Sequence, residues 1–597
     1  MPDLTKSSAV AESSAAAGTR SASVIAQRTS SPAEVAPAAA RRLRWWNTLV
    51  ITVPAAAVLA LGYSHRWVGD DALIYTRAVR QILAGNGPVH NIGERAETST
   101  GTLWQWLLAL GGLVTGTDPA LLAVVLGLVT TVAGWLLAGD AARRLHGGAR
   151  LVPVGVLVLL PVAAVWDYAT SGLETGLITF WPAGCWWLMV TGASRAASGR
   201  RRALTAAAFG LGPLVRPDLA LVTGVFLVVW YALLRPGVRS ALAQAAAALA
   251  LPLAYEVFRA GYYGVLVPLP GLAKEASEAV WLRGLVYAAN FVLPYQLWIP
   301  ALLLSVLVLP ARRVLSRRLL LLVSAPAVSG ALSVVYVVRV GGDFMHGRML
   351  LPGLLLMMLP LWALPPGRRT TRVAGALGIW AVCCLLLWRP PGQSSHFKIF
   401  DQHTGYQHLT GVRHPTEQRD HRAIRTPFTA RVERAAARPE PTLVLETSFN
   451  RTYLELPLSE RFHARVAATR VMLGHSGLVV PLDGLSIDPQ GLAYPLAAHL
   501  ERTHIGKAGH DKRLPDAWII ADYTDPGTPL PPGVDRGAVA AARHALSCGP
   551  LAELQDSVRQ PMSPERFWRN LTGSWQRTSF RFPSDPYAAE AALCRNT

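Results

Sequence analysis

Two adjacent carboxylates, Asp70 and Asp71, stand in a segment between two apolar blocks that also contains Glu94 and Glu97. Carboxylates at a membrane face are costly unless they are hydrated, paired or bound to a cation, so several on one side predict a shared polar cavity. A carboxylate there could act as a base or a metal ligand at the phosphate end of a lipid-linked substrate. The competing interpretation is that Asp70 and Asp71 only cap a helix beginning near Ala72.

Adjacent carboxylates raise each other's pKa unless a cation intervenes, so Asp70 and Asp71 need not share a role. Our hypothesis assigns one or both to catalysis. The candidate contacts to the sugar or the acceptor are acidic or aromatic residues near the same face: Glu94, Glu97, Trp104 and Asp343.

Cationic side chains near the same face are candidates for binding a phosphate: Arg216, Lys274, His346 and Arg348. Arginine presents a planar fork of donors that matches a phosphate, and His346 could add a third donor. The alternative for the arginines is ion pairing with their sequence neighbours Asp218 and Asp343, and a lone lysine such as Lys274 is more often solvated.

A membrane domain must position these residues. Hydrophobic residues make up 51% of the 597 residues and charged residues only 16%, and the apolar residues fall in blocks of roughly 16 to 22. Segments 151–165 and 319–338 carry no charge at all. This pattern is typical of a polytopic membrane protein and excludes a soluble fold.

Arginine-rich turns separate the apolar blocks, and the positive-inside rule places such turns in the cytoplasm. About eleven spans are predicted between them: 45–63, 119–138, 151–166, 172–190, 203–215, 217–234, 240–258, 287–309, 319–338, 348–364 and 373–389. This alternation leaves the N-terminus in the cytoplasm and the C-terminus outside the plasma membrane. The segment 103–113 is expected to lie on the membrane surface.

The chain is predicted to have three parts. Residues 1–40 are rich in Ala, Ser and Thr and are expected to form a disordered cytoplasmic tail. Residues 41–389 form the membrane domain, with the acidic loop at about 64–102, and residues 390–597 form an extracytoplasmic α/β domain.

Within the last part, residues 442–445 and 517–520 look like strands. Cys548 and Cys594 form a plausible disulfide if this domain is extracytoplasmic, and two free thiols remain the alternative.

The net charge of +20 does not indicate nucleic-acid binding, because the arginines collect in the short turns between apolar blocks. No Walker loop, zinc-ligand spacing or nucleophile elbow is present in the sequence.

A set of motifs in a fixed order resembles the actinobacterial terminal β-(1→2)-arabinofuranosyltransferases. The motifs are Asp70-Asp71-Ala72, Gly85-Asn86-Gly87-Pro88-Val89, Gly93-Glu94-Arg95, Gly341-Gly342-Asp343-Phe344-Met345-His346, Asp488-Pro489 and Gly509-His510-Asp511-Lys512. The similarity covers essentially everything after residue 45.

The resemblance implies a GT-C fold and transfer of arabinofuranose from decaprenyl-phosphoryl-arabinofuranose to the end of a cell-envelope arabinan. It implies that Asp70 and Asp71 are the catalytic acidic pair and that His346 and Arg348 contact the donor phosphate. No nucleotide sugar is implied, and a divalent cation (Mg²⁺, Mn²⁺ or Ca²⁺) is left open. If donor and product are both β-linked, the configuration is retained, and a single in-line displacement does not describe the reaction.

Other functions remain alternatives on the sequence alone. A polyprenyl-phosphomannose-dependent mannosyltransferase would use the same fold and the same acids. A transporter would show inverted repeats and charges near mid-span, and neither is found. A non-catalytic envelope assembly factor is the third alternative. The expected partners are thus a lipid-linked sugar donor, a glycan acceptor and the bilayer.

Overall fold

The computed structural model describes residues 32–193, 198–311, 315–387, 397–447 and 452–594. The chain divides into two compact units, Met1–Trp45 and Trp46–Thr597. The described residues of the first unit form the beginning of helix α1 (Pro32–Ser64). Residues 1–31 of the predicted tail lie outside the described ranges. Helix α1 begins at Pro32, within the remaining part of the predicted tail, residues 32–40.

Six segments within the described ranges have the length and hydropathy that a membrane crossing requires. They are Ala38–Ser64 of α1, Pro119–Leu145 (α4), Pro217–Leu234 (η1, Pro217–Leu219, and α10, Ala220–Leu234), Val238–Tyr262 (α11), Arg317–Arg339 (α15) and Arg368–Leu386 (α17). The chain is therefore a multi-pass membrane protein.

The other predicted spans are helices that are shorter, broken or less apolar. Span 151–166 divides into α5 (Val154–Leu159) and α6 (Ala163–Asp167) around Pro161, which cannot donate a helical hydrogen bond. The remaining ones are α7 (Thr175–Gly192), α8 (Gly199–Gly210), α9 (Gly212–Val215), α13 (Trp281–Val292), α14 (Trp298–Ala311), α16 (Leu351–Met358) and η2 (Leu359–Leu361). The count of eleven spans remains a prediction.

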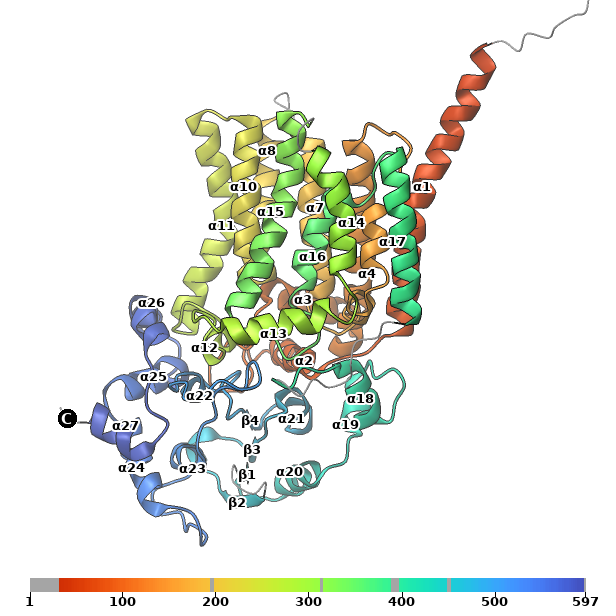
Figure 1. Ribbon diagram of the computed structural model, residues 1–597. Helices are drawn as coiled ribbons and strands as arrows, with labels where there is room; N and C mark the ends of the chain where they lie inside the picture. The colour runs from red at the N-terminus through yellow and green to blue at the C-terminus, as the bar shows by residue number, and fades with distance from the viewer. Residues whose placement is uncertain (1–31, 194–197, 312–314, 388–396, 448–451, 595–597) are drawn as a thin grey trace, which may run out of the picture. The chain divides into compact units, whose positions relative to one another are not determined.

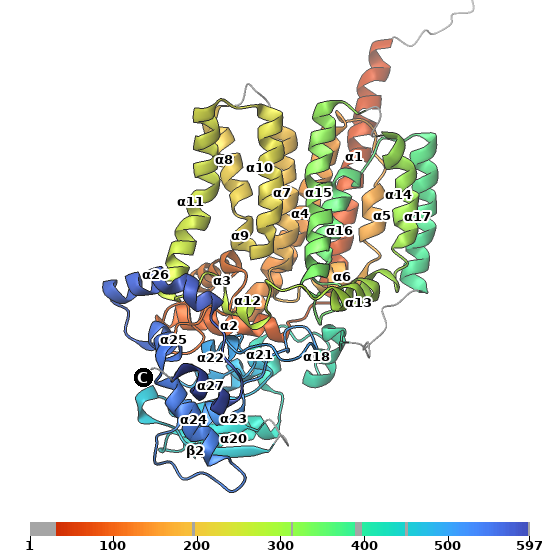
Figure 2. The same cartoon turned by 60° about the vertical axis from the view of Figure 1, so that its left-hand side comes forward.

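Short helices lie at the end of the bundle that faces the C-terminal domain (Figure 1). They include α2 (Asp70–Leu83) and α12 (Leu269–Ala273), and both views agree on this placement (Figure 2). Helix α3 (Thr102–Thr115) has 14 residues. Its length of about 21 Å is less than the hydrocarbon thickness of about 30 Å, which fits the predicted surface placement of 103–113.

The C-terminal domain contains a four-stranded sheet in the order β2-β1-β3-β4. The strands are β1 (Thr442–Glu446), β2 (Tyr453–Pro457), β3 (Val466–Thr469) and β4 (Leu485–Ile487). Only the β1–β2 pair is antiparallel. Strand β1 forms because its residues alternate between two cores: Leu443 and Leu445 pack in one, and Val444 packs in the other with Phe428.

Helices surround this sheet. They are α18 (Gln402–Thr410), α19 (Gln418–Arg422), α20 (Pro427–Ala437), η3 (Glu460–Phe462), α21 (Leu473–Val479), α22 (Pro495–Ala498), α23 (Asp516–Tyr523), α24 (Arg536–Leu546), α25 (Gly549–Arg559), α26 (Pro564–Ser579) and α27 (Pro586–Leu593).

The prediction of a strand at 517–520 is wrong, because this segment is part of helix α23. In a short buried apolar segment, the hydrophobic pattern does not distinguish a helix from a strand. Here Pro515 is the N-cap residue of a helix. The predicted boundary at 389/390 lies outside the described residues.

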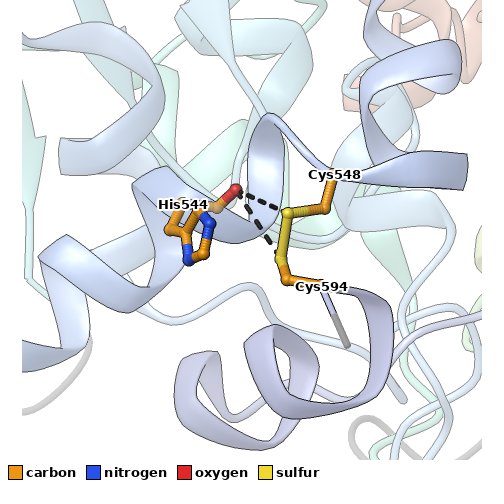
Figure 3. Close-up of side chains that lie close together, drawn as sticks. All are labelled: His544, Cys548 and Cys594. Atoms are coloured by element: carbon orange, nitrogen blue, oxygen red, sulfur yellow. Dashed lines mark hydrogen bonds between the residues drawn. A yellow bond between two sulfur atoms is a disulfide. The ribbon is translucent and has the colours of Figure 1, made fainter. Parts of the chain in front are cut away.

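Cys548 and Cys594 are joined in a disulfide beside His544 (Figure 3). It connects the start of α25 with the end of α27 and so holds the last helix on the domain. The pairing predicted from the sequence is therefore present in the structure.

Buried polar contacts seat the C-terminal domain on the membrane domain. Arg283 of α13 pairs with Asp511 at 2.6 Å, and both side chains are almost completely buried. Asn91 exchanges two hydrogen bonds with the backbone of Ser486, at 2.9 and 3.0 Å. Because broken buried pairs are costly, these contacts fix the domain rigidly over the end of the bundle.

Candidate active site

A cavity of about 1060 Å³ lies between the C-terminal domain and the end of the membrane bundle. Its wall combines α2, the turn at Arg216, the segment 267–278, the loop 342–349 and parts of the C-terminal domain. Its charged lining consists of Asp71, Glu174, Arg216, Asp218, Lys274, Glu275, Glu278, Arg283, Asp343, Arg348, Glu501, Arg502 and Arg581. A chamber of this size at a membrane face, with charged side chains in a largely apolar lining, suits a substrate whose head is charged and whose tail is apolar.

The chemistry-bearing part of the cavity is the cluster of Asp71, Asp343 and Arg348. The Arg348 guanidinium donates to Asp343 at 2.6 Å and to Asp71 at 3.3 Å. Burial alone would lower the pKa of Arg348, but the charges of Asp343 and Asp71 outweigh burial and raise it. Asp71 makes only the longer contact, and its side chain is 21% exposed to the cavity. Of the two acids in this cluster, Asp71 is therefore the one that is more open to the cavity, since the Asp343 side chain is 5% exposed.

The loop that holds this cluster depends on glycine. Gly342 has φ +68°, in the left-handed region, and a Cβ there would lie 2.4 Å from the Tyr287 ring. Tyr287 in turn donates to the Met345 carbonyl at 2.9 Å and accepts from the Met349 N–H at 3.0 Å. The close packing on Tyr287 aims the loop's charged side chains at the cavity.

Asp70 has a different role from its neighbour. Its two carboxylate oxygens accept hydrogen bonds from the backbone N–H groups of Gly474 (3.0 Å) and His475 (2.9 Å), in the first turn of α21. Neither Asp70 nor Asp71 caps its own helix, since the N-cap of α2 is Gly69 and has no side-chain cap. Asp70 therefore ties α2 to the C-terminal domain, and the simple capping interpretation is wrong.

Asp70→Asn is expected to change how stability depends on pH. Burial and the charge of Asp71 raise the pKa of Asp70 from 3.8 to about 6, against the hydrogen bonds that lower it. A raised pKa stabilises the fold at low pH, and this gain is lost as the pH rises through about 6. Relative to Asp70→Asn, the wild type should thus lose about 1 kcal/mol between about pH 5 and pH 7.

Melting temperatures of purified protein at the two pH values measure this difference, with the exposed Asp483→Asn as the control. A wild type that gains stability relative to Asp70→Asn as the pH rises would contradict the prediction, because the fold would then favour the charged form.

The predicted phosphate-binding cations divide into paired and unpaired ones. Arg216 donates to both oxygens of Asp218, at 2.5 and 2.8 Å, as its alternative interpretation proposed. Lys274 has no ion pair among the described residues. It lies against Gly509, where a Cβ would come within 3.0 Å of the lysine Cε. Lys274 is thus a free cation in the cavity wall.

Like Asp70, four predicted binding residues lie outside this cavity. Glu94 pairs with Arg559 at 2.9 Å, and Glu97 pairs with Arg259 at 2.6 Å. Both carboxylates thus point into ion pairs and not into the cavity. The sequence of a loop shows which acids it contains but not the direction of each side chain. The other two are Trp104 and His346.

Trp104 is fully buried, and its Nε1 donates to the Gly172 carbonyl at 3.1 Å. The ring nitrogens of His346 lie 2.8 Å from Asn290 Oδ1 and 3.2 Å from the Tyr295 hydroxyl. Burial lowers the pKa of His346 to about 4, so it is neutral at physiological pH. These positions give both residues structural contacts and place neither in the cavity wall.

Some cavity residues were not among the predicted site residues. Glu174 accepts a hydrogen bond from Tyr75 at 3.1 Å, and the Tyr75 hydroxyl accepts from the Gly101 N–H at 2.7 Å. Glu501 and Arg502 enter the wall from the C-terminal domain. No spacing could connect them with Asp71, because they lie more than 400 positions away in the sequence.

A shared metal ion needs converging ligands. Within the described ranges, the one group of three or more His, Cys, Asp or Glu side chains close enough is His544, Cys548 and Cys594. Two of these three are joined in the disulfide and carry no thiolate (Figure 3). In the cavity, the Arg348 guanidinium supplies the positive charge between Asp71 and Asp343.

Comparison with known proteins shows the family to which the chain belongs. The model of the AftB family C-terminal domain matches residues 430–591. A protein of Mycobacterium tuberculosis named terminal beta-(1->2)-arabinofuranosyltransferase is 36% identical, over 90% of this chain and 96% of its own length. The chain belongs to this family. A Corynebacterium glutamicum protein of the same name is 34% identical, over 88% of this chain and 85% of its own.

The resemblance drawn from the sequence motifs is thus confirmed, and the protein is a glycosyltransferase. Its mostly helical architecture with several apolar helices fits a membrane enzyme of the GT-C type. No solved structure matches the chain. Family membership removes the transporter and the assembly factor as alternatives.

Proposed function

We propose that the enzyme moves arabinofuranose from decaprenyl-phosphoryl-arabinofuranose to the end of a cell-envelope arabinan or related glycan. It does so at the outer face of the plasma membrane, with its N-terminus in the cytoplasm. The observation that carries the proposal is the Asp71–Arg348–Asp343 cluster in a cavity roofed by the C-terminal domain. The names of the two relatives supply the sugar.

The proposed reaction breaks the bond between the anomeric carbon and the donor phosphate oxygen, and the electron pair leaves with the phosphate. Arg348 and Lys274 stabilise the charge on that phosphate. The acceptor hydroxyl oxygen forms the new bond to the anomeric carbon, and its proton goes to Asp71, whose negative charge also stabilises the developing oxocarbenium ion. Asp343 keeps Arg348 in place through the 2.6 Å ion pair. Asp70 is a positioning residue, because its oxygens are bound by α21.

The roof of the cavity is the proposed acceptor site. Glu501 and Arg502 belong to the C-terminal domain and line the cavity, and Arg502 pairs there with Glu278 of the membrane domain. Carboxylates and guanidinium groups are good hydrogen-bond partners for sugar hydroxyls. The acceptor glycan would thus enter from the domain side and the lipid donor from the bilayer side.

Transfer of labelled arabinose from synthetic polyprenyl-phosphoryl-arabinofuranose to an arabinan oligosaccharide, by purified protein, tests the proposal. Product is expected with the arabinosyl donor and not with polyprenyl-phosphomannose. Transfer of mannose only would move the function to the mannosyltransferase alternative. Failure with every lipid-linked sugar would overturn the proposal.

In the same assay, Lys274→Gln is expected to raise the KM for the donor about tenfold or more, because a hydrogen bond to a charged group contributes about 1.5 to 3 kcal/mol. The matched control is Lys398→Gln, since Lys398 is exposed and lies outside the cavity wall. An unchanged donor KM for Lys274→Gln would remove this lysine from the phosphate site.

A further inference from the structure

Helix α26 of the C-terminal domain buries a row of polar residues and exposes two tryptophans. Its buried residues are Arg566, Asn570, Ser574 and Arg577. Trp568 and Trp575 are 63% and 71% exposed. They are seven residues apart, so they lie on one face of the helix. A helix on a water-exposed surface shows the opposite arrangement, with polar residues outward.

The buried polar face is fully committed to the protein. Arg566 and Arg577 both pair with Glu553 of α25, at 2.5 and 3.0 Å. The Asn570 amide donates to the Ser557 carbonyl at 2.9 Å. These bonds leave α26 no freedom to rotate about its axis, so its tryptophans are held outward by the fold.

The contact of α26 with the membrane-crossing helix α11 sets the depth of α26 relative to the bilayer. Helix α11 presents an exposed apolar stripe of Leu249, Leu253 and Val257. One turn further along the stripe is Gly261, and Phe567 of α26 packs so closely on it that a Cβ there would lie 2.2 Å from the ring. Helix α26 thus touches the face of α11 that turns toward lipid.

The same end of α11 carries aromatic residues, which are enriched where a membrane meets water. The rings of Tyr255, Phe258 and Tyr262 follow one another with centroids 5.5 and 5.1 Å apart. Figure 2 shows α26 running across this end of α11. Two hydrogen bonds to the turn after α11 hold it there: Leu266 N–H to Thr578, and Arg577 to the Gly264 carbonyl, both 2.8 Å.

We propose that α26 is an interfacial anchor whose Trp568 and Trp575 lie among the lipid headgroups of the leaflet on the side of the C-terminal domain. Tryptophan suits this depth, because its ring is apolar and its indole N–H can still reach water or a headgroup. The exposed Arg569 on the same helix can contact lipid phosphates. Trp575 also lines the cavity, so the anchor holds one wall of the cavity at the lipid surface.

Site-directed fluorescence in liposomes tests the anchor without any activity measurement. Trp568→Cys and Trp575→Cys would each be labelled with an environment-sensitive dye in the full chain, with the three cysteines outside the disulfide, Cys185, Cys383 and Cys384, replaced by alanine. Lipids carrying a nitroxide near the headgroup, or at the end of the acyl chain, report the depth. The control is Ala540→Cys, at an exposed position on α24.

Both tryptophan positions are expected to give blue-shifted emission and strong quenching by the shallow nitroxide, with Ala540→Cys quenched by neither lipid. Quenching at the tryptophan positions that is no stronger than at the control would overturn the anchor. Protection from aqueous iodide without any quenching by lipid would overturn it too, and would indicate a protein partner on this face.

Discussion

Asp71→Asn is expected to lower the rate of sugar transfer about a hundred- to ten-thousand-fold, the range that a positioned acid or base contributes. The substitution keeps the shape of the side chain and removes its charge and its basicity. Arg348 keeps its shorter bond to Asp343, so the loop around it should stay in place. The turnover number measured with saturating donor and acceptor reports the loss.

Two controls separate chemistry from folding in this experiment. The exposed Glu433→Gln, on α20, makes the same carboxylate-to-amide change outside the cavity and should leave the rate unchanged. The melting temperature of Asp71→Asn should stay close to that of the wild type. A variant that is folded and turns over at the wild-type rate would show that Asp71 is not a catalytic residue.

Arg77→Met is expected to destabilise the protein by about 3 to 5 kcal/mol, because it removes a buried hub of hydrogen bonds. Arg77 of α2 is fully buried, and its donors bind five backbone carbonyls. These belong to His90, Gly477, Val480, Pro481 and Gly484, at 2.8 to 3.1 Å. Methionine fills the space of the side-chain stem and leaves these acceptors without a donor.

Arg77→Lys should recover only part of this loss, since an ammonium group has three donors and no planar fork. Arg80→Met is the matched control on the same helix, because Arg80 donates no side-chain hydrogen bond in the described residues. Melting temperature and limited proteolysis of the C-terminal domain give the two readouts. Equal melting of Arg77→Met and Arg80→Met would rule out the hub.

The membrane character of the chain could be predicted because apolar blocks and arginine turns are local features. The helix breaks could not be placed in the same way. Pro161 interrupts span 151–166, and yet Pro182, Pro252 and Pro326 lie inside continuous helices. Whether a proline ends a helix depends on the groups that neighbouring helices supply to the freed carbonyl, and a single sequence does not contain this information.

The site was predictable where its residues share one short loop. Asp343 and Arg348 are five positions apart, and the structure joins them. Asp71 reaches the same arginine across 277 positions, and only the family motif connected them. Arg77 had no signal at all, since its partners on α21 and the following turn lie 400 or more positions away. Long-range geometry of this kind is set by tertiary packing.

The hydrogen bonds from α21 to Asp70 affect when the enzyme becomes active during its synthesis. Asp71 is made early during translation, and the segment that holds its helix is made about 400 residues later. When the ribosome has finished the last apolar helix, Asp71 has therefore been made, but α21, which binds Asp70 and so positions α2, has not. Turnover should begin only when residues beyond 470 have folded back onto α2, so the growing chain passes through the membrane in an inactive form.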